Sequence, residues 1–354
     1  MEAPVDHDRG DGGADAPGIL PLEVRGVRLG DLGGLRRLSA LYRLNQPDSL
    51  LGPSSVLRDG LAASVPLVRG DRPAFVACAG QRLVGFAQFL AVAPDQRWRL
   101  LTLGSAVGVF DADPVWEALL THAVRDAGLR GVKRLYARLP TGTPLAPAFR
   151  RTAWAPYATE TVLAAAGLGR PKGTFGGRAQ TQSDTWAIHQ LYNAAVPRPV
   201  QDAEAYTSHR WELRSAGRGT RDRNAGWLVE EGHDVVGYAR VASRVGVHVL
   251  ELVVLPGRSD VLDDLLSGAL AALPDPPARR VSCAVRGYQA DVATALEGRG
   301  FVPVGEQELL VKYTTARVRR PTADSVAFHL EVRESLPQRV PSFLHGRPRD
   351  GSAN

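Results

Sequence analysis

The chain repeats itself, and this repeat constrains the fold more than any other feature of the sequence. Residues 75–87 and 227–239, which lie 152 positions apart, each consist of an apolar run, a turn that contains glycine, and a second apolar run. This pattern is typical of a β-hairpin. The 354 residues are also enough for two domains of ordinary size. The sequence therefore predicts one fold that occurs twice.

The correspondence continues downstream of the hairpins. A helical pattern, a strand and a closing helix–strand unit each recur at offsets of 146 or 147, in the pairs 115–120 with 261–266, 133–139 with 280–286, and 149–163 with 296–310. Each half thus predicts a strand, helix, hairpin, strand, helix, strand, helix and closing strand. A unit of this length exceeds the periods of solenoid repeats, which are about 20–45 residues. The repeat indicates a duplicated domain.

Composition suggests where the two units begin and end. We expect an acidic, Gly-rich, disordered leader over residues 1–20 and a Pro- and Arg-rich tail over 319–354 whose end is disordered. The tail has apolar stretches at 328–332 and 340–344 that are suited to docking on a domain. Between them we predict an N-terminal domain over residues 21–166, a linker over 167–178 and a C-terminal domain over 179–318.

Bulk properties narrow the class of protein. Hydrophobic residues make up 44%, yet no run reaches the roughly 18 apolar residues of a membrane helix. Cys78 and Cys283 each lie in an apolar strand pattern, which predicts buried thiols in a reducing cytoplasm and no metal site. The net charge of +6 is spread over the chain, and the basic stretches 218–223 and 317–320 are typical of a solvated surface. Nucleic-acid binding is therefore the weakest of the hypotheses.

The order of elements and three local motifs resemble the GNAT superfamily of acetyltransferases. Residues 295–304 are similar to the family's helix, Gly-Phe pair and closing strand, and residues 235–239 to its central hairpin. Residues 249–256 resemble the strand that leads into the family's acetyl-CoA loop. With the repeat, the resemblance covers about 290 residues. It implies an α/β fold of two tandem GNAT-like domains, each with a mixed, mostly antiparallel sheet flanked by helices and splayed at its centre.

The resemblance also implies acetyl-CoA, or another acyl-CoA, as a co-substrate. In the family, pantetheine pairs with the backbone of one splayed strand, which corresponds here to Leu252, Val253, Val254 and Leu255. The pyrophosphate lies on a Gly-rich loop at a helix N-terminus, where main-chain N–H groups favour an anion. Gly257, Arg258 and Ser259 occupy that position.

Both loops depart from the family's Arg-Gly-x-Gly-x-Gly/Ala pattern. The loop of the second half has one glycine, and Asp260 either brings negative charge toward the pyrophosphate or caps the helix. In the first half, Asp113 and Pro114 are typical of a plain helix start. The second half is therefore the better predicted CoA binder.

Candidate catalytic groups are also confined to the second half. Glu251 stands where the family often places its general base, and burial in an apolar strand would raise a carboxyl pKa. The alternative is a glutamate at a strand edge without a catalytic role. The family's usual acid is a tyrosine, but Leu296 and Phe149 occupy that position. Tyr288, at the end of the preceding strand, is the substitute we predict, with a packed surface aromatic as the alternative.

The acceptor in this family binds beside the first helices. Residues 200–213 contain Tyr206, His209, Trp211 and Glu212, which suit either an acceptor pocket or an amphipathic helix packed on the sheet. We expect an N-acyltransferase for a small-molecule or peptide amine, located in the cytoplasm and without a membrane partner. The alternative is a non-catalytic acyl-CoA-binding or scaffold protein built from two degenerate GNAT domains. The oligomeric state stays open, with a homodimer among the alternatives.

Overall fold

Apart from β2 (Ala40–Arg43) in the first half and α6 (Arg198–Glu204) and η4 (Ser208–Trp211) in the second, the described elements form two sets in the same order, as predicted. The computed structural model describes residues 21–38, 40–45, 47, 72–92, 96–106, 112–168, 175–213, 223–244, 247–271, 273 and 280–314. The leader 1–20, residues 107–111, the tail stretches 328–332 and 340–344 and the basic stretch 317–320 lie outside the described residues, and of the basic stretch 218–223 the description includes Arg223.

The elements of the N-terminal half are β1 (Leu22–Gly26), the 3₁₀ turn η1 (Leu29–Asp31), α1 (Leu32–Leu35), β2 (Ala40–Arg43), β3 (Ala74–Ala79), β4 (Arg82–Val92), β5 (Arg97–Ser105), α3 (Asp113–Leu129), β6 (Arg134–Pro140), α4 (Ala146–Arg151) and β7 (Ala155–Ala165). Those of the C-terminal half are β8 (Arg178–Ala179), η3 (Gln182–Asp184), α5 (Thr185–Ala195), α6 (Arg198–Glu204), η4 (Ser208–Trp211), β9 (Arg223–Glu231), β10 (Asp234–Arg244), β11 (Val247–Val254), α7 (Ser259–Ala271), β12 (Arg280–Arg286), α8 (Ala290–Gly298) and β13 (Val302–Tyr313).

Two equivalent glycines confirm the register of the repeat. A Cβ on Gly85 would lie 2.4 Å from Val115 and 3.0 Å from Leu119, both on α3. A Cβ on Gly237 would lie 2.5 Å from Val261 and 2.7 Å from Leu265, both on α7. In each half the same strand therefore needs glycine so that the same helix can pack closely on it. The predicted hairpins β3–β4 and β9–β10 turn at Gly80 and Gly232, which have positive φ angles of 57° and 65°.

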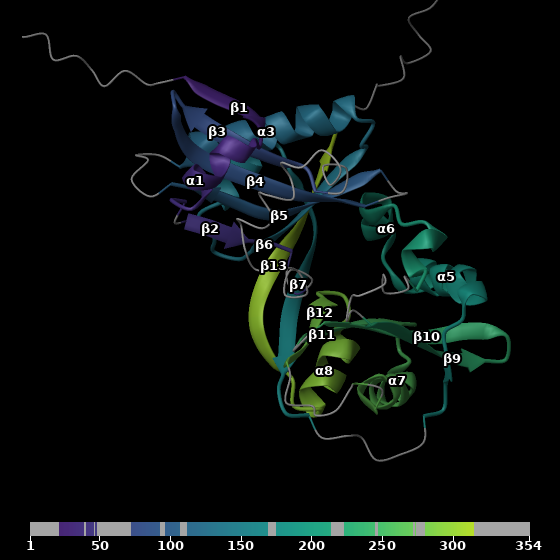
Figure 1. Ribbon diagram of the computed structural model, residues 1–354. Helices are drawn as coiled ribbons and strands as arrows, with labels where there is room; N and C mark the ends of the chain where they lie inside the picture. The colour runs from purple at the N-terminus through teal and green to yellow at the C-terminus, as the bar shows by residue number, and fades with distance from the viewer. Residues whose placement is uncertain are drawn as a thin grey trace, which may run out of the picture. The chain divides into compact units, whose positions relative to one another are not determined.

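The two halves exchange their closing strands. β7, which ends the N-terminal half, pairs with β12, and β13, which ends the C-terminal half, pairs with β6. β7 and β13 also pair with each other in antiparallel fashion, so the described strands form one 13-stranded sheet (Figure 1). We predicted a sheet for each of the two tandem domains; in the described residues one sheet runs through both halves. Residues from the first half consequently reach the site of the second.

A bidentate Arg–Asp pair ties the first strand of each half to its first helical turn. Arg25 donates to both carboxylate oxygens of Asp31, at 2.7 and 2.8 Å, and Arg178 donates to both oxygens of Asp184, at 2.8 Å. These charge-assisted hydrogen bonds hold the pKa of both aspartates below the ordinary value, although burial opposes the shift. The pairs lie 153 positions apart and are a further element of the repeat.

The apolar faces of the sheet are covered by helices from the same half. α3 and α4 pack on the N-terminal strands around Phe89, Leu119 and Phe149, and α7 and α8 pack on the C-terminal strands around Leu265 and Phe301. Cys78 and Cys283 are buried and unpaired, as predicted. Across the opposite face of the C-terminal strands, α5 and η4 form a smaller aromatic core. The candidate site lies beside this third cluster.

Candidate functional site

In each half the two central parallel strands separate along their length. β5 and β6 pair only from Arg97 to Arg99, and β11 and β12 pair only from Val247 to Leu250. Beyond those residues each pair of strands diverges, as predicted for a splayed centre. A main-chain N–H or C=O group that points into such a gap needs a partner from elsewhere. The two halves meet this need in different ways.

In the N-terminal half the gap is filled by the chain itself. Strand β2 pairs with β5 over Thr102–Ser105, on the edge opposite β4. The segment continues across the gap, because Leu44 N–H donates to Leu101 O at 2.8 Å and Asn45 N–H donates to Arg138 O of β6 at 3.4 Å. Leu44 is fully buried in the N-terminal core. β2 therefore occupies the place where the splayed strands of this half would otherwise be open.

In the C-terminal half the gap opens into a cleft. It holds about 780 Å³ of space that is partly open to solvent. Its lining comes from both halves because of the strand exchange. The lining includes the polar and aromatic residues Arg138, Glu160, Tyr192, Glu204, Tyr206, Arg210, Trp211, Arg240, Glu251, Arg286, Tyr288 and Gln289, together with Leu252. Polar groups that converge with aromatic side chains in a cleft are a feature of small-molecule sites.

Gln289 bridges the two splayed strands. Its Nε2 donates to Leu252 O of β11 at 3.3 Å, and its Oε1 accepts from the N–H of Arg286 in β12 at 3.0 Å. Because strand residues alternate in direction, Leu252 and Val254 turn their main-chain groups toward the gap, whereas Val253 and Leu255 turn theirs toward β10. The N–H of Leu255 accordingly donates to Val236 O at 3.2 Å.

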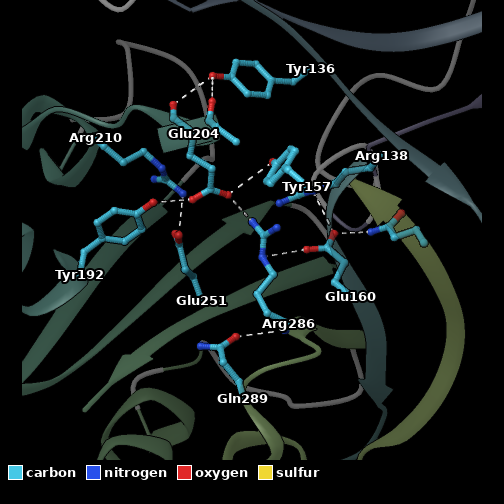
Figure 2. Close-up of polar contacts among 12 residues, drawn as sticks. Tyr136, Arg138, Tyr157, Glu160, Tyr192, Glu204, Arg210, Glu251, Arg286 and Gln289 are labelled. Carbon is cyan, nitrogen blue, oxygen red and sulfur yellow. Dashed lines mark hydrogen bonds and ion pairs between the residues drawn. The ribbon is translucent and has the colours of Figure 1, made fainter. Parts of the chain in front are cut away.

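A buried ionic network forms one wall of the cleft (Figure 2). Glu204, at the end of α6, accepts from Tyr192 Oη at 2.7 Å, from Arg286 Nη2 at 2.7 Å and from Tyr157 Oη at 3.5 Å. Glu160, whose side chain is fully buried, forms ion pairs with Arg138 at 2.9 Å and Arg286 at 3.3 Å.

The network fixes the protonation state of its arginine and its tyrosines. Burial disfavours the cation of Arg286, but Glu204 and Glu160 outweigh it and hold the Arg286 pKa well above its ordinary value. Burial, together with the charge of Glu204, raises the pKa of Tyr157 and Tyr192, so both keep their protons at neutral pH.

The N-terminal half also holds the end of α6 in place. Tyr136 Oη donates to the carbonyls of Ala203 and Glu204 at 2.9 and 3.0 Å, and Arg97 donates to those of Glu204 and Ala205 at 3.4 Å. A cation at the C-terminus of a helix satisfies its last carbonyls and matches its dipole. The first half thereby positions a wall of the cleft in the second.

The structure places Glu251 in the cleft, on the face of β11 that is turned toward η4. Its Oε1 accepts from Arg210 Nη2 at 2.6 Å, and the two side chains are 33% and 28% exposed. The expectation of a glutamate in an apolar environment was wrong, because Arg210 and, across the strand pair, Arg240 accompany it. The carboxylates that are deeply buried are Glu160 and Glu204.

Tyr288 lies at the rim of the same cleft, directly after β12. It is 38% exposed, and partial burial of its hydroxyl raises its pKa. The hydroxyl therefore keeps its proton at neutral pH, as a proton donor must. The structure brings Tyr288 and Glu251 into one cleft but records no hydrogen bond between them.

Gly257, Arg258 and Ser259 form the turn into α7. Gly257 has a φ of +78° with open space around its Cα, and α7 begins at Ser259. Arg258 pairs with Asp260 at 2.8 Å and with Glu231 at 2.6 Å, which keeps its pKa above the ordinary value. Asp260 thus acts on Arg258, an effect that the sequence did not predict. The corresponding loop of the N-terminal half lies mostly outside the described residues.

The segment 200–213 does not form one amphipathic helix. α6 ends at Glu204, Ala205 adopts a left-handed φ of 43°, and η4 follows. Tyr206 and Trp211 line the cleft, and Trp211 is also buried in the aromatic core. His209 and Glu212 are exposed and pair with each other at 2.7 Å, outside the cleft lining. The alternative of one amphipathic helix over this segment is therefore wrong, and an acceptor pocket that includes Tyr206 and Trp211 stays a prediction.

Sequence reasoning missed Glu160, Glu204, Arg210 and Arg286. The repeat contained one usable signal, because Glu160 aligns with Gln307 at the offset of 147. The two residues lie opposite each other on β7 and β13, and Gln307 Nε2 donates to Glu160 at 2.5 Å. Polar residues at equivalent positions of both closing strands indicated a polar contact between the halves.

Comparisons with known proteins agree with this architecture. No protein-family model and no curated protein matches the sequence. Among solved structures, the chain is similar to a tandem GNAT protein from the clavulanic acid biosynthesis pathway, at 17% identity and a TM-score of 0.51, over 84% of this chain and 99% of that one. It is also similar to a GCN5-related N-acetyltransferase from Sphaerobacter thermophilus, at 15% identity and a TM-score of 0.52, over 84% and 98% of the two chains.

The chain therefore has the tandem GNAT fold, an α/β architecture with two GNAT-like halves. In the part of the chain that the structure describes, no helix is long and apolar enough to cross a membrane. Within the same residues, no group of three His, Cys, Asp or Glu side chains is arranged to hold a metal ion.

Proposed function

We propose that the protein transfers an acyl group from acyl-CoA to an amine, with acetyl-CoA as the donor and the C-terminal half as the active one. The observation that carries this proposal is the difference between the two gaps: the gap in the N-terminal half is filled by β2, and the gap in the C-terminal half opens into a polar cleft. The names of the two similar structures, a tandem GNAT protein and an N-acetyltransferase, support acyl transfer as the class of reaction.

The pantetheine arm would lie along β11 in the open gap. Of the four residues predicted to contact it, Leu252 and Val254 have main-chain groups that face the gap, so they would pair with its amides, while Val253 and Leu255 shape the strand from the side of β10. Gln289 already donates to Leu252 O, as a pantetheine amide would. The pyrophosphate would lie on Gly257, Arg258 and Ser259 at the N-terminus of α7.

The reaction needs a neutral amine. Glu251 would take a proton from the acceptor's ammonium, and the amine nitrogen would then attack the thioester carbonyl carbon. A C–N bond forms, the C–S bond breaks, and the CoA thiolate leaves and takes a proton from Tyr288 or from water. The donor regains a proton from the second N–H that the nitrogen loses as it becomes an amide. The products are an amide, CoA with its thiol, and one proton that Glu251 returns to solvent. Glu251 must first loosen its contact with Arg210 to accept a proton on the same oxygen.

A non-catalytic acyl-CoA-binding or scaffold role is the second candidate. The observation in its favour is the state of Arg258, whose guanidinium is neutralised by Asp260 and Glu231. An arginine that is held by two carboxylates attracts a pyrophosphate less strongly.

We also propose that the chain has domains over residues 21–166 and 179–318, joined by a linker over 167–178. A cytoplasmic location is a further proposal, which the two unpaired cysteines support.

Isothermal titration with acetyl-CoA tests the proposal, with wild-type protein, Arg258→Glu and Glu251→Gln compared in parallel. We expect one acetyl-CoA per chain, weaker binding by Arg258→Glu, and unchanged binding by Glu251→Gln. Release of CoA in an acceptor screen should then fall in Glu251→Gln. Binding without turnover by any acceptor would favour the second candidate, and no binding to wild-type protein would refute both.

A further inference from the structure

Solvent can reach the ion pair of Arg210 with Glu251 in the cleft. Arg210 and Glu251 are about one third exposed, whereas the side chains of Glu160, Glu204 and Arg286 are 0%, 3% and 13% exposed. A ligand that enters from solvent therefore meets a guanidinium and a carboxylate side by side, with 2.6 Å between Nη2 and Oε1. The buried network behind them is already paired and forms the rigid wall.

Arg210 is held in place by contacts that leave its charge accessible. Its Cζ lies 5.3 Å from the ring centres of both Tyr206 and Trp211, and Arg240 Nη1 donates to its carbonyl at 3.3 Å. Stacking on two aromatic rings orients the plane of the guanidinium before any ligand arrives. A planar, preoriented guanidinium is suited to a carboxylate because two parallel N–H groups match its two oxygens.

The charges of the described lining argue against an acceptor that is only a cation. Four arginines, at positions 138, 210, 240 and 286, face three glutamates, at 160, 204 and 251. A polyamine or a lysine side chain would bring further positive charge into this surplus. An acceptor with one ammonium and one carboxylate adds no net charge. Its carboxylate meets the charge of Arg210, and its ammonium meets that of Glu251.

We propose that the acceptor is a small zwitterionic amine, namely a free amino acid. Its carboxylate binds Arg210 and its ammonium binds Glu251, so the four charges alternate around a ring. The inference rests on the proposed function, since Glu251 then receives the proton from the ammonium that it binds, and the amine nitrogen attacks the thioester as described above. Tyr192, Tyr206 and Tyr288 line the same cleft and would contact the rest of the molecule.

Paired acceptors that differ only in the carboxylate test this inference. CoA release is measured with the twenty amino acids, with their amides and methyl esters, and with spermidine and an N-acetyl-lysine amide as amines without a carboxylate. At least one free amino acid should exceed its own amide in kcat/KM by about tenfold to a hundredfold, the value of one charge-assisted contact. Equal or faster turnover of amides, esters or spermidine would overturn the proposal.

Variants locate the discrimination. Arg210→Gln should raise KM for the free amino acid by about tenfold or more and leave KM for its amide unchanged, and Arg210→Lys should recover part of the loss. Glu212→Gln and His209→Gln are the matched controls, because both residues are exposed and close to Arg210 in the sequence but lie outside the cleft lining. If Arg210→Gln affects acid and amide equally, Arg210 does not bind the carboxylate.

Three outcomes separate this inference from the proposed function. If acetyl-CoA binds and amines without a carboxylate are acylated, the acyltransferase proposal stands and the zwitterionic acceptor is wrong. If acetyl-CoA binds and none of the amino acids is acylated, the zwitterionic acceptor is likewise refuted. If acetyl-CoA does not bind, the proposed function itself fails, and saturation-transfer NMR with the amino acid mixture then tests whether the Arg210–Glu251 dyad binds zwitterions independently of CoA.

Discussion

The two halves of the chain share one fold but treat its central gap in opposite ways. In the N-terminal half, β2 pairs with the free edge of β5, and Leu44 and Asn45 carry the segment across to β6. In the C-terminal half, the equivalent edge of β11 accepts a hydrogen bond from the side chain of Gln289 at Leu252 O and borders the cleft. The same duplicated architecture therefore yields one closed and one open gap.

The closed half still contributes to the open site. β7 delivers Glu160 and Tyr157 to the cleft wall, β6 delivers Arg138, and Arg97 with Tyr136 holds the end of α6. A half whose own gap is filled thus serves as a scaffold for the other. One copy of a duplicated domain can therefore be needed by the other copy even when its own gap is closed.

The largest expected effect comes from the segment that closes the first gap. Leu44→Ala should lower the free energy of unfolding by about 2–5 kcal/mol, because it leaves a cavity at a fully buried position. Urea denaturation measures this loss, and titration should still give one acetyl-CoA per chain with wild-type affinity. A second acetyl-CoA bound by this variant would show that β2 is a displaceable plug rather than a permanent part of the core.

The next effect concerns the equivalent strand positions Ser105 and Val254, which pair with Gly85 and Gly237 in the two hairpins. Val254→Pro removes an N–H that faces the open gap, so acetyl-CoA affinity should fall by about tenfold to a hundredfold with little change in stability. Ser105→Pro removes an N–H on the edge that pairs with β2, so it should lower stability by about 1–3 kcal/mol and leave binding unchanged.

Titration and thermal unfolding of both proline variants, each compared with wild type, distinguish the roles of the two edges. The comparison breaks if Ser105→Pro weakens acetyl-CoA binding and Val254→Pro does not, since the cofactor would then belong to the N-terminal half.

The Arg–Asp pairs provide a comparison of the two halves through pH. Hydrogen bonds from Arg25 and Arg178 hold the pKa of Asp31 and Asp184 below the ordinary value. Each carboxylate therefore stabilises the fold fully above the unfolded pKa of about 3.9, and this stabilisation is lost as the pH falls through the lower folded pKa.

At neutral pH, Asp31→Asn and Asp184→Asn should each cost about 1–2 kcal/mol in the free energy of unfolding. Each aspartate also accepts from a backbone N–H, Asp31 from Arg28 and Asp184 from Thr181, but the loss should be larger for Asp184 because it accepts from the Thr181 hydroxyl as well. Urea titrations at neutral pH and at about pH 3 measure both differences, which should shrink in acid. A cost that grows as the pH falls would contradict this account.

Sequence was sufficient for the elements of the fold because their signals are local. These signals are the two-residue turns with Gly80 and Gly232, the helical spacing of apolar residues in α3 and α7, and the sequence pattern shared by the two closing strands. Each can be read from a short stretch of sequence. The choice of neighbour for a strand is not local. β7 and β13 have the pattern of closing strands whichever partner they take, so their exchange between the halves could not be predicted.

The site was predicted only in part for the same reason. Glu251 and Tyr288 were predicted because Glu251 lies in a recognisable strand and Tyr288 follows one. Arg210 lies 41 positions from its partner Glu251, and Arg286 lies 82 positions from Glu204, so neither pairing leaves a local pattern. Among the described residues of the second half, no strand corresponds to β2, and a feature that occurs once is invisible to an analysis of repeats.

The smallest expected effect concerns the loop before α7. Asp260→Asn removes one of the two carboxylates that hold Arg258, so acetyl-CoA should bind about two- to fivefold more tightly at low ionic strength. Because Arg258 and Asp260 lie at the surface, salt should screen the gain, and titrations at low and at high ionic strength should converge. Asp263→Asn is the matched control, since its carboxylate pairs with Arg299 instead. Tighter binding in that control too would mean that overall charge, rather than release of Arg258, governs pyrophosphate binding by the open half.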